Sequence, residues 1–331
     1  MASIDLSPKP PSPADWRKAG LRYHSLNFFY RKKFGCRVWK VSIDGGLDCP
    51  NRDGTLATGG CIFCDPASFS PSRRMALPSI TAQIQEGIGR LAPRYGVDRF
   101  VAYFQPATNT YGPPARLQAL YEEAISHPKV VGLAVGTRPD CVGEDVLDLL
   151  AQISRRTWVA IEYGLQTIHD RTLDWLQRGH HYDSFLDAVD RSRRRGLAIG
   201  AHVILGLPGE TREDMLATAR ELARLNVGSV KLHNLYAVKK TPLADLVARG
   251  EASFPALEQY AGWVVDFLEE LPPDCVVDRL SGDAPPEYLI GPSWCLGKSA
   301  VRAAVEAEFR CRDSWQGRKW TALNGRVGSG V

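Results

Sequence analysis

The sequence predicts an α/β protein that has a parallel sheet with helices packed outside it. Two features predict this: short β-branched or aromatic runs, and segments between them with apolar residues at i, i+3, i+4 and i+7. The runs begin near Val38, Phe100, Val130, Thr157, Ala198 and Ser229. Most are separated by roughly thirty residues, the length of one strand–helix–strand unit with parallel strands. The 331 residues, 44% hydrophobic and 24% charged, have the composition of a globular protein with a packed core.

Local signals define individual helices along the chain. Pro113 and Pro114 open a predicted helix that runs to residue 127, because proline suits the first helical turn. Thr211 and Asp214 form a capping-box pattern before a helix that runs to residue 225. In the last quarter of the chain we expect helices over 255–271 and 297–309 and a strand over 275–280.

The pattern divides the chain into three parts. A basic N-terminal segment covers residues 1–37 and is partly disordered, since its first fifteen residues are rich in proline and poor in apolar side chains. The α/β core covers residues 38–240. A C-terminal α/β extension covers residues 241–331, where the strand–helix alternation loosens.

Three of the eight cysteines have a spacing that indicates chemistry. Cys49, Cys61 and Cys64 stand in a C-x11-C-x2-C arrangement, in a glycine-rich loop directly after the predicted strand over 38–44. Three thiolates can hold an iron–sulfur cluster and leave one coordination position open. A structural zinc site needs four ligands, with Cys36 as the only cysteine upstream. A redox-active Cys61–Cys64 pair without metal is a third interpretation.

The motifs around these cysteines resemble one bacterial family. They cover residues 22–27 (RYHSLN), 40–46 (KVSIDGG), 48–55 (DCPNRDGT), 59–64 (GGCIFC) and 313–317 (DSWQG). Together they resemble radical SAM proteins of the YhcC type, which are related to the Elongator catalytic subunit and to oxygen-independent coproporphyrinogen oxidases. The resemblance implies a partial (β/α)6 barrel with its site at the carboxyl ends of the strands. It also implies a [4Fe–4S] cluster on Cys49, Cys61 and Cys64, whose fourth iron is chelated by S-adenosylmethionine (SAM).

The same resemblance implies contacts to SAM, and no residue is assigned a catalytic role. Gln105, at the end of the second strand, corresponds to the segment that holds the amino group. Arg138 is expected to pair with the SAM carboxylate or a substrate anion, and Glu162 to accept from the ribose hydroxyls. The backbone around His202 is expected to lie at the edge of the adenine. The remaining candidates for cofactor binding are Gln166 and Arg178.

The sequence also limits the location and the partners of the chain. It contains no export signal and no run of apolar residues long enough to span a membrane, so we expect a cytoplasmic protein. The chemistry needs a one-electron donor such as flavodoxin or ferredoxin. The substrate that the Elongator relationship implies is a tRNA base. The alternatives are a small metabolite, or a zinc-stabilised nucleic-acid-binding module without catalysis.

Charge is unevenly distributed along the chain. Residues 1–40 contain nine Lys or Arg and two Asp or Glu, and residues 298–331 contain seven and three, so both ends are basic although the whole chain carries only +4. Basic ends beside the barrel mouth would steer a polyanion toward it. The oligomeric state is left open, and so are the roles of the remaining cysteines, Cys36, Cys141, Cys275, Cys295 and Cys311.

Overall fold

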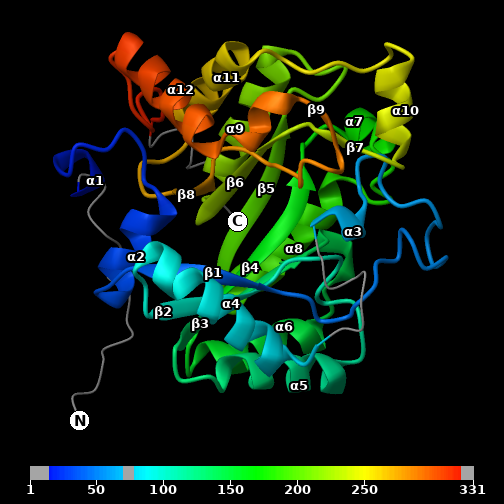
Figure 1. Cartoon of the computed structure of the whole chain (residues 1–331), viewed down its shortest axis with the longest axis vertical. Coiled ribbons are helices and arrows are strands. Elements are labelled where there is room, and N and C mark those ends of the chain that lie inside the picture. Colours follow the sequence, from blue (N-terminus) through cyan, green and yellow to red (C-terminus); the bar gives the residue numbers. More distant parts are fainter. Residues whose placement is uncertain (1–14, 70–77, 322–331) are drawn as a thin grey trace, which may run out of the picture.

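A computed structural model describes residues 15–69 and 78–321 of the chain. The proline-rich start of the chain, expected to be disordered, lies almost entirely outside the described residues. The core of the fold is a seven-stranded parallel sheet in the order β1-β2-β3-β4-β5-β6-β8 (Figure 1). Its strands are β1 Val38–Ile43, β2 Arg99–Phe104, β3 Val130–Thr137, β4 Trp158–Gln166, β5 Ala198–Leu205, β6 Ser229–Asn234 and β8 Val276–Arg279. Two short strands, β7 Ala237–Val238 and β9 Leu289–Gly291, pair in an antiparallel manner apart from this sheet.

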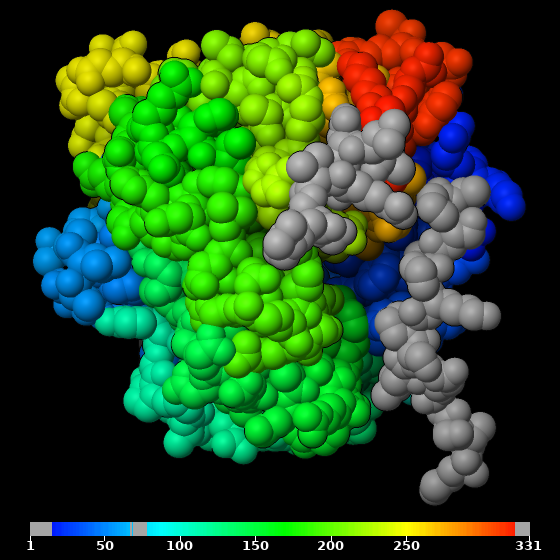
Figure 2. All heavy atoms as spheres, turned by 180° about the vertical axis from the view of Figure 1, so that it is seen from behind, coloured from blue at the N-terminus to red at the C-terminus, as the bar shows by residue number. Residues whose placement is uncertain are grey.

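Helices follow the strands and cover one face of the sheet. In chain order they are α1 Asp15–Lys18, α2 Leu26–Phe34, α3 Pro66–Phe69, α4 Ile80–Tyr95, α5 Pro114–Ile125, α6 Glu144–Ser154, α7 Asp170–Trp175, α8 Tyr182–Arg194, α9 Arg212–Arg224, α10 Pro242–Ala248, α11 Leu257–Glu270 and α12 Lys298–Cys311. From behind, helices from the middle of the chain, in green, form a closed outer layer (Figure 2). Strand residues such as Val41, Phe100 and Ile161 pack there in one continuous apolar core. The result is the parallel sheet with outer helices that the sequence pattern predicts, curled into the partial barrel that the family resemblance implies.

Most of the sequence-predicted elements are confirmed. All six core strands begin within two residues of the expected positions. The capping box before α9 is present, with the Thr211 and Asp214 side chains each bonded to the other's backbone. The strand expected in the C-terminal extension is β8, and it joins the sheet beside β6, so the sheet continues past residue 240.

The amino end of the barrel is filled by α2, a helix that was not predicted within the basic N-terminal segment. α2 places Tyr30 and Phe34 against Trp158 at the start of β4, with ring centroids 5.6 and 6.1 Å apart. Tyr30 also packs with Val38 and Val101 in a small separate core. The helix therefore closes the base of the barrel and leaves the carboxyl ends of the strands as its open end.

The two edge strands, β1 and β8, are joined by side chains. Lys40 on β1 donates to Asp278 on β8 at 2.6 Å. The segment before α2 contributes as well, because the Val277 amide donates to the His24 carbonyl at 2.8 Å and Ser25 bridges to Val277. An ion pair and one chain segment thus close the gap where strand pairing is missing.

Lys40 belongs to a buried charge network on the inner face of the sheet. Its ammonium also donates to Glu162 at 2.5 Å, and Glu162 accepts from His202 at 2.8 Å and from Lys231 at 3.2 Å. The Lys231 ammonium donates to the Tyr103 hydroxyl at 2.6 Å. The network therefore ties together side chains of β1, β2, β4, β5, β6 and β8.

The network sets the protonation states of its members. Burial raises the pKa of the Glu162 carboxyl, but Lys231, Lys40 and His202 outweigh burial and hold it well below its ordinary value. Burial lowers the pKa of Lys231 to about 8, against the opposing effect of Glu162. For Lys40, Asp278 and Glu162 outweigh the effect of burial and raise the pKa. Glu162 is therefore a carboxylate whose charge depends on its cationic neighbours.

The packing of α4 on β1 predicts opposite effects at two glycines of one helix. A Cβ on Gly87 would lie 2.5 Å from Cγ1 of the buried Val41, whereas nothing lies within 4 Å of that position on Gly89. We expect Gly87→Ala to lower the free energy of unfolding by about 1–3 kcal/mol through overpacking. Gly89→Ala should raise it by about 0.5–1 kcal/mol, because alanine is the better helix former. Urea unfolding midpoints measure both, and a gain at Gly87 would contradict this packing.

The buried network predicts a large cost when its central charge is removed. Glu162→Gln leaves Lys231 buried without a carboxylate, and we expect a loss of about 3 kcal/mol of stability. Asp174→Asn is the control, since it breaks the His181–Asp174 pair, whose side chains are 51% and 67% exposed, and should cost less than about 0.5 kcal/mol. Equal shifts in the urea midpoint for the two variants would show that Glu162 does not hold the network together.

Candidate functional site

A cavity of about 630 Å³ opens at the carboxyl ends of the strands. It is lined by side chains of β2, β4, β5, β6 and β8, by residues next to the strand ends, by the loops after β1 and β8, and by the first residue of α12. The lining residues are Phe63, Ser68, Tyr103, Gln105, Gln166, His202, Ile204, Lys231, His233, Asn234, Leu235, Tyr236, Arg279, Asp283, Ala284, Pro285, Pro286, Leu296 and Lys298. A cavity of this size, largely polar at its floor, is large enough for a nucleoside-sized ligand.

The loop between β1 and α4 carries the three cysteines and borders this cavity through Phe63. Its first turn is held by the Cys49 carbonyl, which accepts from the amides of Arg52 and Asp53 at 2.8 and 3.1 Å. Cys61 and Cys64 form a second turn, in which the Cys64 amide donates to the Cys61 carbonyl at 2.9 Å. Both turns are closed by backbone bonds of the loop itself, so the cysteines are held in place independently of a ligand.

The three thiols influence one another electrostatically. Burial is the largest cause of a raised Cys64 pKa, and together with charge on the nearby Cys61 and Cys49 it brings that pKa to about 12. Thiolates at these positions need a cation or a cationic cluster to compensate their mutual repulsion. The donor set, three thiols in one loop beside a cavity, fits an iron–sulfur cluster with an open position.

Two side chains donate to the Cys61 sulfur. Arg178 Nη1 lies 3.2 Å and Asn51 Nδ2 lies 3.5 Å from Cys61 Sγ. Arg178 Nη2 donates to the Gly164 carbonyl at 2.8 Å, which anchors the guanidinium to β4. Its Nε is buried without a hydrogen-bond partner in the described part of the chain. Hydrogen bonds of this kind stabilise negative charge on a cysteine ligand.

The geometry disfavours the zinc alternative. Cys36 is exposed and precedes β1, whereas Cys49 follows it, so the two lie at opposite ends of a six-residue strand roughly 20 Å long. Among the described residues, no three His, Cys, Asp or Glu side chains converge as ligands of a single metal ion. In a cubane cluster each cysteine binds a different iron, so no such convergence is needed.

Gln105 and Gln166 both line the cavity, as expected of SAM contacts. The Gln105 side-chain oxygen accepts from the Ser42 hydroxyl at 3.2 Å. Gln166 is 8% exposed, and its φ of 72° lies in the left-handed region, at a register shift between β4 and β5. A buried non-glycine residue in that conformation is strained, and such strain is concentrated at functional sites.

Arg138 lies beside the cysteine loop and does not line the cavity. Its Nε and Nη2 donate to both oxygens of Asp140 at 3.0 and 2.8 Å. The side chain is buried, and its Nη1 has no partner within the described residues. The two N–H groups of Nη1 are therefore left without a partner. The Nε and Nη2 edge, which could bind a carboxylate through two hydrogen bonds, is already occupied by Asp140.

Glu162 and His202 occupy two depths of the same site. Glu162 lies below the cavity floor, where Lys40, His202 and Lys231 take up its oxygens. His202 lines the cavity, and burial lowers its pKa to about 4, which keeps the ring neutral. Its ring centroid lies 5.5 Å from that of His233, a second neutral histidine of the wall.

Sequence reasoning missed a group of cationic side chains in the cavity lining, which we call the cationic wall. Lys231, Arg279 and Lys298 form it, and Asp283 pairs with Arg279 at 2.7 Å and with Lys298 at 3.0 Å. The available signal was the alternation of apolar and polar residues along β6, because Lys231 points away from the apolar core into which Val230 and Leu232 pack.

Comparisons with known families agree with this architecture. The Radical SAM superfamily matches residues 54–222, and the radical SAM C-terminal domain matches residues 227–310. No helix among the described residues is long and apolar enough to cross a membrane.

Individual relatives cover nearly the whole chain. YtqA of Bacillus subtilis is 38% identical over 94% of this chain and 97% of its own, and YhcC of Escherichia coli is 38% identical over 87% and 94%. A tRNA uridine(34) acetyltransferase of Methanocaldococcus jannaschii is 26% identical over 51% of this chain and 31% of its own. Archaeal Elp3 from Methanocaldococcus infernus shares the fold, with a TM-score of 0.60 and 18% identity over 83% of this chain and 65% of its own.

The sequence matches, the partial barrel and the three-cysteine loop lead to one conclusion. The chain belongs to the radical SAM superfamily, in the YhcC-type family related to the Elongator catalytic subunit, and is an enzyme that uses a [4Fe–4S] cluster and SAM.

Proposed function

We propose that the chain cleaves SAM at the loop of Cys49, Cys61 and Cys64 and directs the radical at a base of tRNA. The observation that carries this proposal is a single loop with three cysteines that borders, through Phe63, a cavity of about 630 Å³ at the open end of the barrel. When bound, the cluster and SAM supply a 5′-deoxyadenosyl radical that abstracts hydrogen.

In this proposal the cysteine loop holds the cluster and the protein tunes it. Cys49, Cys61 and Cys64 would each hold one iron of the cluster and would leave one iron free to bind SAM. Arg178 and Asn51 donate to Cys61 Sγ, so they orient this ligand and stabilise its charge. The unpartnered Nη1 of Arg138 is buried outside the cavity lining, so this proposal assigns it no contact with SAM.

The polar side chains of the lining orient SAM. Gln105 and Gln166 line the cavity with amide groups that can accept from an ammonium group and donate to a carboxylate. His202, held neutral, presents a donor or an acceptor to the nucleoside. Glu162 is a positioning residue in this account, because it aims His202 and Lys231 from below the floor. Because Glu162 is buried and does not line the cavity, we propose this indirect role in place of the direct ribose contact that the resemblance implies.

Two partners follow from the proposed chemistry. Reductive cleavage needs a one-electron donor of the flavodoxin or ferredoxin class, and the cluster lies in a loop at the open end of the barrel. The tRNA substrate is supported by the similarity to proteins named tRNA uridine(34) acetyltransferase. The cationic wall of Lys231, Arg279 and Lys298 suits a substrate with anionic groups.

Cys61→Ala should abolish the cluster and with it the reaction. The wild-type chain, purified without oxygen, should contain about four iron atoms, absorb broadly near 400 nm, and form 5′-deoxyadenosine from SAM after reduction with dithionite. Cys36→Ala is the matched control, an exposed cysteine at the far end of β1. It should keep the iron and the activity. Full iron content and activity in Cys61→Ala would refute the assignment of the ligands.

Arg178 should influence the potential of the cluster as well as SAM binding. Arg178→Leu removes a charged donor from Cys61 Sγ and should lower the reduction potential by on the order of 60 mV, equivalent to about 1.4 kcal/mol. Arg178→Lys keeps the charge and should recover part of the shift. A redox titration followed by electron paramagnetic resonance measures both, and an unchanged potential in Arg178→Leu would show that the contact does not tune the cluster.

A further inference from the structure

We propose that the two basic ends of the chain form one surface that binds the phosphate backbone of RNA, and that α12 connects this surface to the cavity. The inference rests on the proposed action on tRNA and adds the place where the RNA is held. Residues 15–37 contain seven Lys or Arg and one Asp, and residues 298–321 contain six Lys or Arg and three Asp or Glu. The two ends lie side by side, blue and red, in both views (Figures 1 and 2).

Backbone and side-chain hydrogen bonds hold the ends together. The Trp16 indole donates to the Pro273 carbonyl at 2.7 Å, and the Gln316 amide donates to the Arg22 carbonyl at 2.9 Å. The buried Gln316 side chain accepts from the His24 amide at 2.9 Å. These contacts lie before β8, at the closed end of the barrel. The junction is thus a fixed part of the fold, and it does not lie beside the mouth, where the sequence analysis would place it.

Exposed cations concentrate at this junction. The Arg17 and Arg318 guanidinium groups lie 3.9 and 4.8 Å from the ring centroid of Trp315, which keeps two positive charges close together. Arg17, Lys18 and Arg318 are exposed, and none of them has an acidic side-chain partner among residues 15–69 and 78–321. Unpaired cations at this spacing attract a polyanion, because each phosphate contact releases bound counterions.

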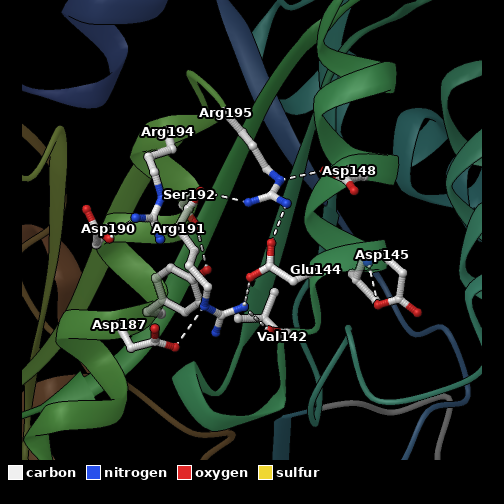
Figure 3. Close-up of polar contacts among 12 residues, drawn as sticks. Val142, Glu144, Asp145, Asp148, Asp187, Asp190, Arg191, Ser192, Arg194 and Arg195 are labelled. Carbon is white, nitrogen blue, oxygen red and sulfur yellow. Dashed lines mark hydrogen bonds and ion pairs between the residues drawn. The ribbon is translucent and has the colours of Figure 1, made fainter.

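The other arginine-rich segment shows what a neutralised surface looks like. Arg191 and Arg195 both pair with Glu144 of α6, and Arg195 also pairs with Asp148 (Figure 3). Arg194 pairs with Asp190 on its own helix at 2.9 Å. This segment is a solvated, charge-balanced face, and it offers little to a phosphate backbone.

α12 provides the connection to the cavity. Lys298, its first residue, lines the cavity, and the last turn leads into the segment that carries Trp315 (Figure 1). Its fourteen residues span about 20 Å. Arg302, one turn after Lys298, is exposed on the way and lies 3.8 Å from Glu306 of the same helix. An RNA held at the terminal surface can therefore follow the helix and present a nucleotide to the cavity.

RNA is favoured over an anionic membrane as the partner. Surface binding to membranes needs apolar side chains that insert between lipids. Of the large hydrophobic side chains counted as exposed in the described chain, only Leu21 belongs to this surface, at 38% exposure. A membrane, moreover, would not explain why the surface is connected to the cavity through α12.

Fluorescence anisotropy with fluorescein-labelled tRNA and the full-length, cluster-loaded chain tests the proposal. The triple variant Arg17→Gln, Lys18→Gln and Arg318→Gln should bind tRNA at least tenfold more weakly near 100 mM salt. Its slope of log K against log salt should be smaller by about 2. The control removes the same charge from exposed arginines elsewhere, through Arg90→Gln, Arg155→Gln and Arg249→Gln, and should change the affinity less than threefold. Equal melting temperatures of the two variants exclude a folding defect.

Three outcomes decide the matter. Equal loss of tRNA affinity in both triple variants would mean that only net charge acts, and would overturn the assigned surface. Sedimentation with phosphatidylserine vesicles in place of tRNA binding would also overturn it, in favour of a membrane. The terminal triple variant should cleave SAM without tRNA as fast as the wild-type chain does. If the wild-type chain itself fails to cleave SAM, that result refutes the proposed function and not this surface.

Discussion

The buried ion network around Glu162 is the interaction on which the rest of the structure depends. A curled sheet of seven strands leaves its edge strands unpaired, and here Lys40 and Asp278 join them with an ion pair of 2.6 Å. Glu162, in the middle of the sheet, accepts a second hydrogen bond from the Lys40 ammonium. Without this compensation the inner face would hold buried lysines that no apolar packing could accommodate. The polar interior is thus a consequence of how the barrel closes.

This closure also determines where chemistry can occur. The base of the barrel is filled by α2 and the outer face by helices, so only the carboxyl ends of the strands remain open. There the cysteine loop, through Phe63, and the cationic wall border one cavity. Lys231 and His202 reach the cavity from above Glu162, so the carboxylate that supports the fold also orients polar groups of the site. Glu162, Lys231 and His202 therefore both stabilise the fold and shape the site.

The sequence predicts those features that depend on local patterns. The strands follow from apolar runs at regular intervals, and α9 follows from Thr211 and Asp214, whose capping interactions span only three residues. The cysteine loop is visible because its spacing is local. The network could not be predicted, because Lys40 meets Glu162 and Asp278 across 122 and 238 residues. Arg138 was predicted as a site residue, but its pairing with Asp140 was not, since it depends on the conformation of the turn that the two residues share.

The central claim is that the radical formed in this cavity abstracts hydrogen from tRNA. It is tested most directly with tRNA isolated from cells grown in deuterated medium, incubated in ordinary water with the reduced, cluster-loaded chain and SAM. The account predicts that the 5′-deoxyadenosine formed carries one deuterium, as measured by mass spectrometry, and that unlabelled tRNA gives none. 5′-Deoxyadenosine without deuterium, formed at the same rate with and without labelled tRNA, would contradict it.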